Sequence, residues 1–254
     1  MKRAIALGLM MMGGILGAAD GAQATLITIG TAGYNGASYN LIWENDHNGR
    51  SLVWLDYTNA PTLWFYQNLW AASLNGTGVL SYDLKPGYHV DWGANPWRLP
   101  TTVDDSQAYA SNNSLPSDFW YSGAYSLGFN NQTSELGHLF YGELGNKGYT
   151  STSGAYPQTG WGLTSVGDFA HLTDSWYWSA TEYGGYLANA WDFIIGYGYQ
   201  LDINKNYFSY GLAVRSGEVS YDQNPVPTPE PGTMLLLGTG LIGLATVGRR
   251  RRAS

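Results

Sequence analysis

Hydrophobic and polar residues alternate along several short stretches of the chain, and this two-residue period is typical of β-strands. The last four stretches follow one another through short turns such as Asn204-Lys205-Asn206. Short connections join antiparallel neighbours, so the pattern predicts an antiparallel sheet. The expected strands are 25–39 (interrupted by turns), 40–43, 51–55, 176–181, 190–195, 199–203 and 210–215.

Two other stretches repeat their hydrophobic residues every three or four positions, which is the period of an α-helix. The second of them, 134–144, can be capped by Thr133 or Ser134 and ends at Gly145-Asn146. Helices early and strands late in a chain favour an α+β domain. The first helix covers 62–74, and its buried face is expected to contain Leu63, Tyr66, Trp70 and Leu74.

The first 24 residues have the three parts of a secretory signal peptide. Lys2 and Arg3 form a basic start, an apolar stretch covers 4–19, and Ala22-Gln23-Ala24 is a small-x-small cleavage site. A membrane anchor fits this length and these flanks less well. Cleavage by signal peptidase after Ala24 therefore leaves residues 25–224 as the expected mature extracellular domain.

The other end of the chain combines a stiff linker with an apolar run and a basic tail. Residues 225–231 read PVPTPEP, residues 232–248 carry no charge, and a basic tail occupies 249–254. A helix over 232–248 would reach about 25 Å, enough for a thin bilayer. Arginines do not cross hydrocarbon cheaply, so the tail is expected to stay cytoplasmic while the mature domain lies outside.

These residues resemble the PEP-CTERM sorting signal, in which a Pro-Glu-Pro triplet precedes an apolar helix and an arginine cluster. The resemblance implies recognition by an exosortase, cleavage near the triplet, and transfer to the surface or matrix of a Gram-negative bacterium that makes exopolysaccharide. An ordinary tail anchor that is never cut is the alternative. The motif residues are Pro229, Glu230 and Pro231, and the membrane-stop residues are Arg249, Arg250, Arg251 and Arg252.

Charge and cysteine content exclude several functions. Within 25–224, six lysines and arginines stand against seventeen aspartates and glutamates, a net charge of −11. Such a surface repels nucleic acid, which binds basic patches. The chain has no cysteine, so no thiol chemistry is available, and no motif indicates a cofactor.

Aromatic residues are the most prominent feature of the mature domain, with 11 tryptophans and 20 tyrosines in the chain. Most are expected to fill the core, because each ring buries a large apolar area. Flat rings with one polar edge also suit sugar binding. The candidate glycan contacts lie in Gly- and Tyr-rich segments and are Trp120, Tyr121, Tyr125, Tyr149, Tyr156, Trp161, Tyr183, Tyr186, Tyr197 and Tyr199.

One loop has a partial metal-binding pattern. Glu44, Asp46 and Asn48 alternate before Gly49 as in a calcium loop, but Leu55 stands where an EF-hand has glutamate. A turn rich in Asn and Gly needs no metal. None of the four histidines, His47, His89, His138 and His171, has metal-ligand spacing with another.

Several motifs in order resemble the Lcl C-terminal-like (collagen-like adhesin C-terminal) family over about residues 40–218. The resemblance implies a single C-type-lectin-like α+β domain with two helices and an antiparallel sheet, similar to formylglycine-generating enzymes. The calcium-sugar motifs of true C-type lectins and the cysteines of the enzyme branch are absent. The motifs are Asn68–Leu74, Trp97–Thr102, Tyr177–Glu182, Ala190-Trp191 and Ala213–Arg215.

Six residues of these motifs are expected to have structural roles. The Arg98 guanidinium can fork onto a carboxylate or onto carbonyls beneath its loop, and Pro100 forces the preceding residue out of helical geometry. The two motif tryptophans after residue 170 are expected to pack in the sheet. The full set is Trp97, Arg98, Pro100, Trp178, Trp191 and Arg215.

Together these features predict a non-enzymatic surface or biofilm-matrix protein that associates with exopolysaccharide through aromatic-lined loops. A passive structural surface protein is one alternative. A polysaccharide-degrading enzyme is another, and it would need two carboxylates flanking the scissile bond, such as Glu182 and Asp192. No spacing in the sequence selects that pair.

Overall fold

The computed structural model describes residues 26–47, 49–109 and 116–222. The segments expected as signal peptide (1–24), linker (225–231), membrane helix (232–248) and basic tail (249–254) lie outside this part of the chain. Within the described residues, no helix is both long and apolar enough to cross a membrane.

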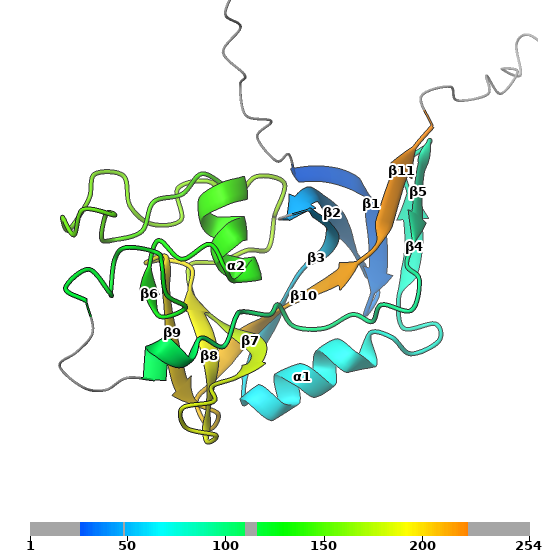
Figure 1. Ribbon diagram of the computed structural model, residues 1–254. Coiled ribbons are helices and arrows are strands. Elements are labelled where there is room, and N and C mark those ends of the chain that lie inside the picture. The colour runs from blue at the N-terminus through cyan, green and yellow to red at the C-terminus, as the bar shows by residue number, and fades with distance from the viewer. Residues whose placement is uncertain (1–25, 48, 110–115, 223–254) are drawn as a thin grey trace, which may run out of the picture.

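Eleven strands and four short helical segments make up the described structure (Figure 1). The strands are β1 (Leu26–Tyr34), β2 (Ala37–His47), β3 (Arg50–Thr62), β4 (Ser81–Leu84), β5 (Tyr88–Asp91), β6 (Gly128–Phe129), β7 (Trp176–Glu182), β8 (Asn189–Ile194), β9 (Tyr199–Asn204), β10 (Ser209–Ser216) and β11 (Glu218–Tyr221). The helical segments are α1 (Trp64–Ser73), the 3₁₀-helix η1 (Ser106–Tyr109), α2 (Glu135–Gly137) and the π-helix η2 (His138–Glu143).

Nine of the strands form one sheet in the order β4-β1-β2-β3-β10-β7-β8-β9-β6, and β11 pairs with β5 in a second, two-stranded sheet. The turn between β1 and β2 is Asn35-Gly36, whose φ angles of 50° and 79° suit a tight hairpin. The late strand β10 inserts between β3 and β7, so it joins the two halves of the sheet seen in Figure 1.

The central strands are buried on both faces. In β3, Leu52 and Trp54 belong to one apolar cluster, while Val53 and Leu55 belong to another. Successive side chains of a strand point to opposite faces, so both faces of β3 need a cover. Residues of α2 and η2 cover one face, and α1 runs along the other side of the sheet (Figure 1).

The expected α+β class with an antiparallel sheet is wrong, because the protein is mostly β, with 40% strand and 12% helix. The helix expected over 134–144 has only three α-helical residues before its backbone widens into η2. The sheet is also mixed, since β10 pairs with β7 in parallel. The predicted C-type-lectin-like domain, with its two helices, is therefore not what the structure has; its main element is a nine-stranded sheet.

The buried face of α1 also differs from the expected one. Tyr66 is exposed, whereas Gln67 and Ala71 are buried. The Gln67 amide donates to the carbonyls of Ala60 and Ser209, at 2.7 and 2.9 Å. These polar contacts fix the rotation of the helix and override the hydrophobic pattern of its sequence.

Candidate functional site

Five aromatic side chains gather at the end of the sheet where β7 begins and β8 turns into β9. Trp176 starts β7, Tyr197 lies in the β8–β9 turn, and Tyr149, Tyr156 and Trp161 come from the loop between η2 and β7. The Trp161 and Tyr197 rings are 5.2 Å apart, and the Tyr149 ring lies 5.0 Å from Trp161. We call these five residues the aromatic surface.

The aromatic surface is open to solvent. The exposed fractions are 71% for Tyr156, 47% for Tyr197, 40% for Trp176 and 36% for Trp161. Beside them lies an apolar depression of about 500 Å³, lined by Phe129, Trp176, Ile194, Tyr197 and Tyr199. Exposed rings that adjoin a depression mark interaction sites more often than core.

The backbone beneath the aromatic surface is tightly held. The Tyr149 amide donates to the Tyr197 carbonyl at 2.8 Å, and the Tyr141 hydroxyl donates to the Gly198 carbonyl. Burial raises the pKa of Tyr141 far above its usual range, so the phenol keeps its proton. Gly198 has a φ of +65°, and a Cβ there would meet Phe140 at 2.6 Å, so only glycine fits.

The expected glycan contacts separate into two groups. Tyr149, Tyr156, Trp161, Tyr197 and Tyr199 belong to the aromatic surface or its depression. The remaining candidates lie outside this group: Trp120 and Tyr186 are exposed, Tyr121 and Tyr125 are half-buried, and Tyr183 is buried with its ring 5.1 Å from Trp191. Tyr183 is therefore a core residue. The sequence did not suggest the exposed Trp176 as a glycan contact, because this residue begins a predicted strand.

Arg98 binds a buried carboxylate. Its two terminal nitrogens donate to Glu135 at 2.6 and 2.8 Å, and Nη1 also donates to the Leu99 carbonyl at 3.0 Å. The Glu135 side chain is only 1% exposed and also accepts from the Thr101 amide. This bidentate pair joins the loop of the Trp97–Thr102 motif to α2.

The other motif residues also have structural contacts. The Pro100 carbonyl accepts from the Ala180 amide at 2.7 Å and from the Ser179 hydroxyl at 3.0 Å, so two motifs distant in sequence lie side by side. The Arg215 guanidinium lies 4.6 Å above the Trp92 ring. The motif tryptophans Trp97, Trp178 and Trp191 are buried, and each indole donates a hydrogen bond.

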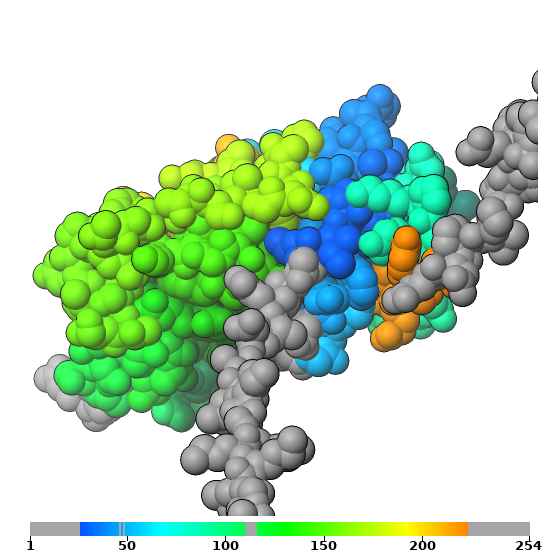
Figure 2. Space-filling view, turned by 90° about the horizontal axis from the view of Figure 1, so that it is seen from above, coloured from blue at the N-terminus to red at the C-terminus, as the bar shows by residue number. Residues whose placement is uncertain are grey.

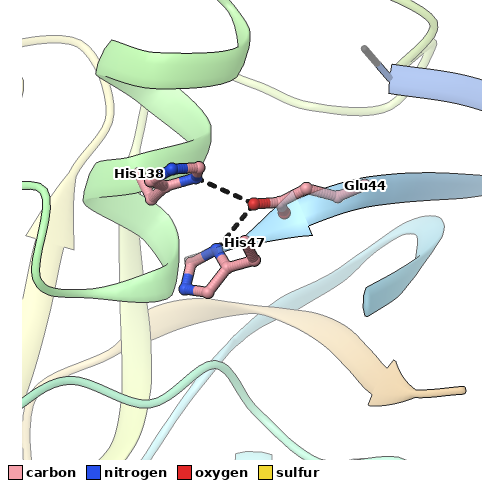
Figure 3. Close-up of side chains that lie close together, drawn as sticks. All are labelled: Glu44, His47 and His138. Carbon is pink, nitrogen blue, oxygen red and sulfur yellow. Dashed lines mark hydrogen bonds and ion pairs between the residues drawn. The ribbon is translucent and has the colours of Figure 1, made fainter. Parts of the chain in front are cut away.

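Besides the aromatic surface, the structure brings together three residues that sequence spacing did not connect (Figure 3). Glu44 Oε1 accepts from Nδ1 of His47 at 2.6 Å and from Nδ1 of His138 at 2.8 Å. The second carboxylate oxygen accepts from the Trp54 indole at 2.7 Å. Burial pushes the pKa of Glu44 upward, but the hydrogen bonds from His138 and His47 outweigh it and lower the pKa.

Of the three residues in the predicted calcium loop, only Glu44 has a described side chain, so calcium binding there stays a prediction. Glu44 points toward two histidines, and imidazole nitrogen is not a calcium ligand. Asn48 and the side chain of Asp46 lie outside the described residues.

Comparison with known proteins identifies the tail of the chain. Residues 227–252 match the PEP-CTERM protein-sorting motif. This motif implies an exported, envelope-associated protein that is processed by an exosortase. No curated protein and no solved structure matches the chain, so the mature domain is described by its own geometry.

Proposed function

We propose that the protein is a non-enzymatic surface or matrix protein that binds exopolysaccharide through its aromatic surface, in a Gram-negative bacterium. The main support for this proposal is the group of exposed rings beside an apolar depression. In this group, the Trp161 and Tyr197 rings are 5.2 Å apart. Sugar rings present apolar C–H faces that stack on such rings, while the tyrosine hydroxyl and indole edges bond to sugar hydroxyls.

The net negative charge of the mature domain makes strongly anionic polysaccharides unfavourable ligands. A net charge of −11 over 25–224 opposes sulfated or phosphorylated polymers at close range. Neutral polysaccharides carry no charge for the domain to repel, so their binding affinity is not reduced in this way. We therefore propose a neutral or weakly charged polysaccharide as the ligand.

The contacts of Glu182 and Asp192 argue against hydrolysis by that pair. A glycosidase needs two carboxylates facing one scissile bond across a cleft. Asp192 is fully buried, and the exposed Glu182 forms an ion pair with Lys205 at 3.1 Å. The pair named from sequence therefore does not share an open cleft.

The Lcl C-terminal-like resemblance remains a proposal about ancestry. It rests on the Trp97–Thr102 and Tyr177–Glu182 motifs, which contact each other through the Pro100 carbonyl. These contacts support a common structural unit and carry no information on the ligand.

The test is affinity electrophoresis of the purified protein through gels that contain the exopolysaccharide of the producing bacterium. We expect retardation of the wild-type protein, and a loss of at least tenfold in affinity for Trp161→Ala combined with Tyr197→Ala, since stacking on a ring contributes about 1 kcal/mol or more. Salt should leave the retardation unchanged.

The matched control is Tyr66→Ala, which removes an equally exposed ring on α1, far from the aromatic surface in sequence and fold. It should bind as wild type. Equal mobility of the wild-type protein with and without polysaccharide would refute glycan binding and leave the passive surface protein. Release of reducing ends from the polymer would instead revive the enzyme.

A further inference from the structure

We propose that Glu44, His47 and His138 form a binding site for one divalent transition-metal ion of the zinc class. The ligand atoms of these three residues all lie within 4.8 Å of one another. Figure 3 shows both imidazoles pointing at the same carboxylate oxygen from different elements, His47 from the end of β2 and His138 from η2.

The distances suit a small ion after a slight expansion. A tetrahedral ion with bonds of about 2.0 Å holds its ligand atoms about 3.3 Å apart. The two Nδ1 atoms lie 2.6 and 2.8 Å from Glu44 Oε1. The two contacts therefore lengthen by about 0.7 and 0.5 Å when an ion replaces the shared protons, a shift that side-chain torsions can absorb.

Two irregular backbone features create the site. Glu44 and His47 are three residues apart, so a regular strand would point them to opposite faces. The β2–β3 register shifts between Glu44 and His47, because Glu44 pairs with Leu52 while His47 pairs with Arg50. This bulge adds one residue and turns both side chains toward the same side.

The second irregular feature is η2 itself. Its backbone closes a bond between the Leu144 amide and the Leu139 carbonyl, five residues apart, at 2.9 Å. Five-residue bonds place His138 and Glu143 on one side of the helix, and Glu143 Oε1 lies 3.8 Å from His138 Nδ1. Glu143, whose side chain is 0% exposed, therefore lies beside His138 without belonging to the three-residue cluster. Such π-turns occur frequently at functional sites.

The surroundings orient the ligands as metal sites require. The Trp54 indole donates to Glu44 Oε2, which leaves Oε1 as a single, fixed ligand atom. The side chains of Glu44 and His47 are 0% and 1% exposed, whereas that of His138 is 13% exposed and gives the ion a route from solvent. Two imidazoles with carboxylate oxygen favour zinc and its neighbours over calcium and magnesium.

The site would hold two distant parts of the chain together. Glu44 and His138 are 94 residues apart in sequence, and the ion would tie the end of β2 to η2. A buried site of this kind, with three protein ligands, stabilises the folded chain. None of its ligands belongs to the aromatic surface, so the metal proposal does not depend on glycan binding.

The test is titration of the chelator-treated, purified full chain with ZnCl₂. We expect one zinc per chain by elemental analysis after desalting, and a rise of several degrees in the unfolding midpoint. His138→Gln and His47→Gln should each weaken zinc binding at least tenfold. His89→Gln, which alters an exposed histidine beside Asp222, should bind zinc as wild type does.

A spectroscopic readout avoids reliance on the variants. Cobalt(II) added to the wild-type chain should give the visible d–d bands of a four-coordinate nitrogen and oxygen site, and zinc should remove them. Substoichiometric zinc, binding that persists in His138→Gln, or a cobalt spectrum identical to the aqueous ion would each overturn the proposal. The three residues would then only stabilise the fold through their hydrogen bonds.

Discussion

At the scale of single residues, burial separates two groups of polar side chains. Glu135 is 1% exposed and has both its oxygens bonded to Arg98. Asp192 is 0% exposed, and among the described residues only the Ser209 hydroxyl acts on its carboxylate, without a hydrogen bond of ordinary geometry. A buried acid without a charged partner is more stable protonated, because desolvation penalises its charge.

The protonation of Asp192 gives a pH-dependent prediction. Burial raises the pKa of Asp192 well above its usual range, and the Ser209 hydroxyl counteracts only part of this shift. The folded state therefore binds a proton that the unfolded chain has lost, so stability is full below the ordinary aspartate pKa and falls as pH rises toward the folded pKa. The slope can reach about 1.4 kcal/mol per pH unit.

Asp192→Asn should remove this dependence. The difference in unfolding midpoint between wild type and variant, measured from pH 4 to pH 8, should shift steadily in favour of the variant. Asp118→Asn, at an exposed position, should run parallel to wild type throughout. Parallel curves for Asp192→Asn as well would contradict a protonated Asp192.

At the scale of elements, the Arg98–Glu135 pair holds α2 against the strands. Arg98 also pairs through its backbone with Val214 of β10, so the guanidinium connects the middle of the sheet to its helical cover. Arg50 lies 3.6 Å from the same carboxylate but is 55% exposed. Arg98, at 26% exposed, and the more exposed Arg50 thus approach the same buried carboxylate from different depths.

Arg98→Ala should cost about 3–5 kcal/mol of unfolding free energy, because it leaves the Glu135 charge buried. Arg98→Met together with Glu135→Leu should recover most of that loss, since no uncompensated charge remains. Arg50→Ala should cost less than about 1 kcal/mol. Urea denaturation of the four proteins measures this, and a double variant no more stable than Arg98→Ala would refute the coupling.

The sequence predicted elements better than their assembly. Alternation located β7, β8, β9 and β10 to within two residues, because strand period depends only on local side chains. It could not show that β10 inserts between β3 and β7, or that η2 departs from α-helical winding after Gly137. The Glu44 cluster depends on that winding and on the β2 bulge, so histidine spacing gave no sign of it.

At the scale of the whole molecule, the loop after η2 shapes one face. Figure 2 shows the segment before β7 running over the top of the molecule to the blue strands β1 and β2. Asp168 fixes that contact by accepting from the Thr28 amide at 3.1 Å, while its carbonyl accepts from Asn40 at 3.1 Å. Asp168 anchors the later part of the loop that carries Tyr149 and Trp161, and the bond from the Tyr149 amide to the Tyr197 carbonyl anchors its earlier part, which keeps the aromatic surface pre-organised.

The folded domain and the sorting motif are separable. The last described strand, β11, pairs with β5 through four residue pairs, from Glu218–Asp91 to Tyr221–Tyr88, before the matched tail begins at residue 227.

Glu230→Ala should therefore leave the unfolding midpoint unchanged but block exosortase processing. In cells, the variant should keep a C-terminal tag and remain in the membrane fraction, while the wild type loses the tag and reaches the surface. Glu218→Ala, an exposed acidic residue within β11, should be sorted as wild type. Equal tag loss from Glu230→Ala and wild type would show that the Pro-Glu-Pro glutamate is not what the protease reads.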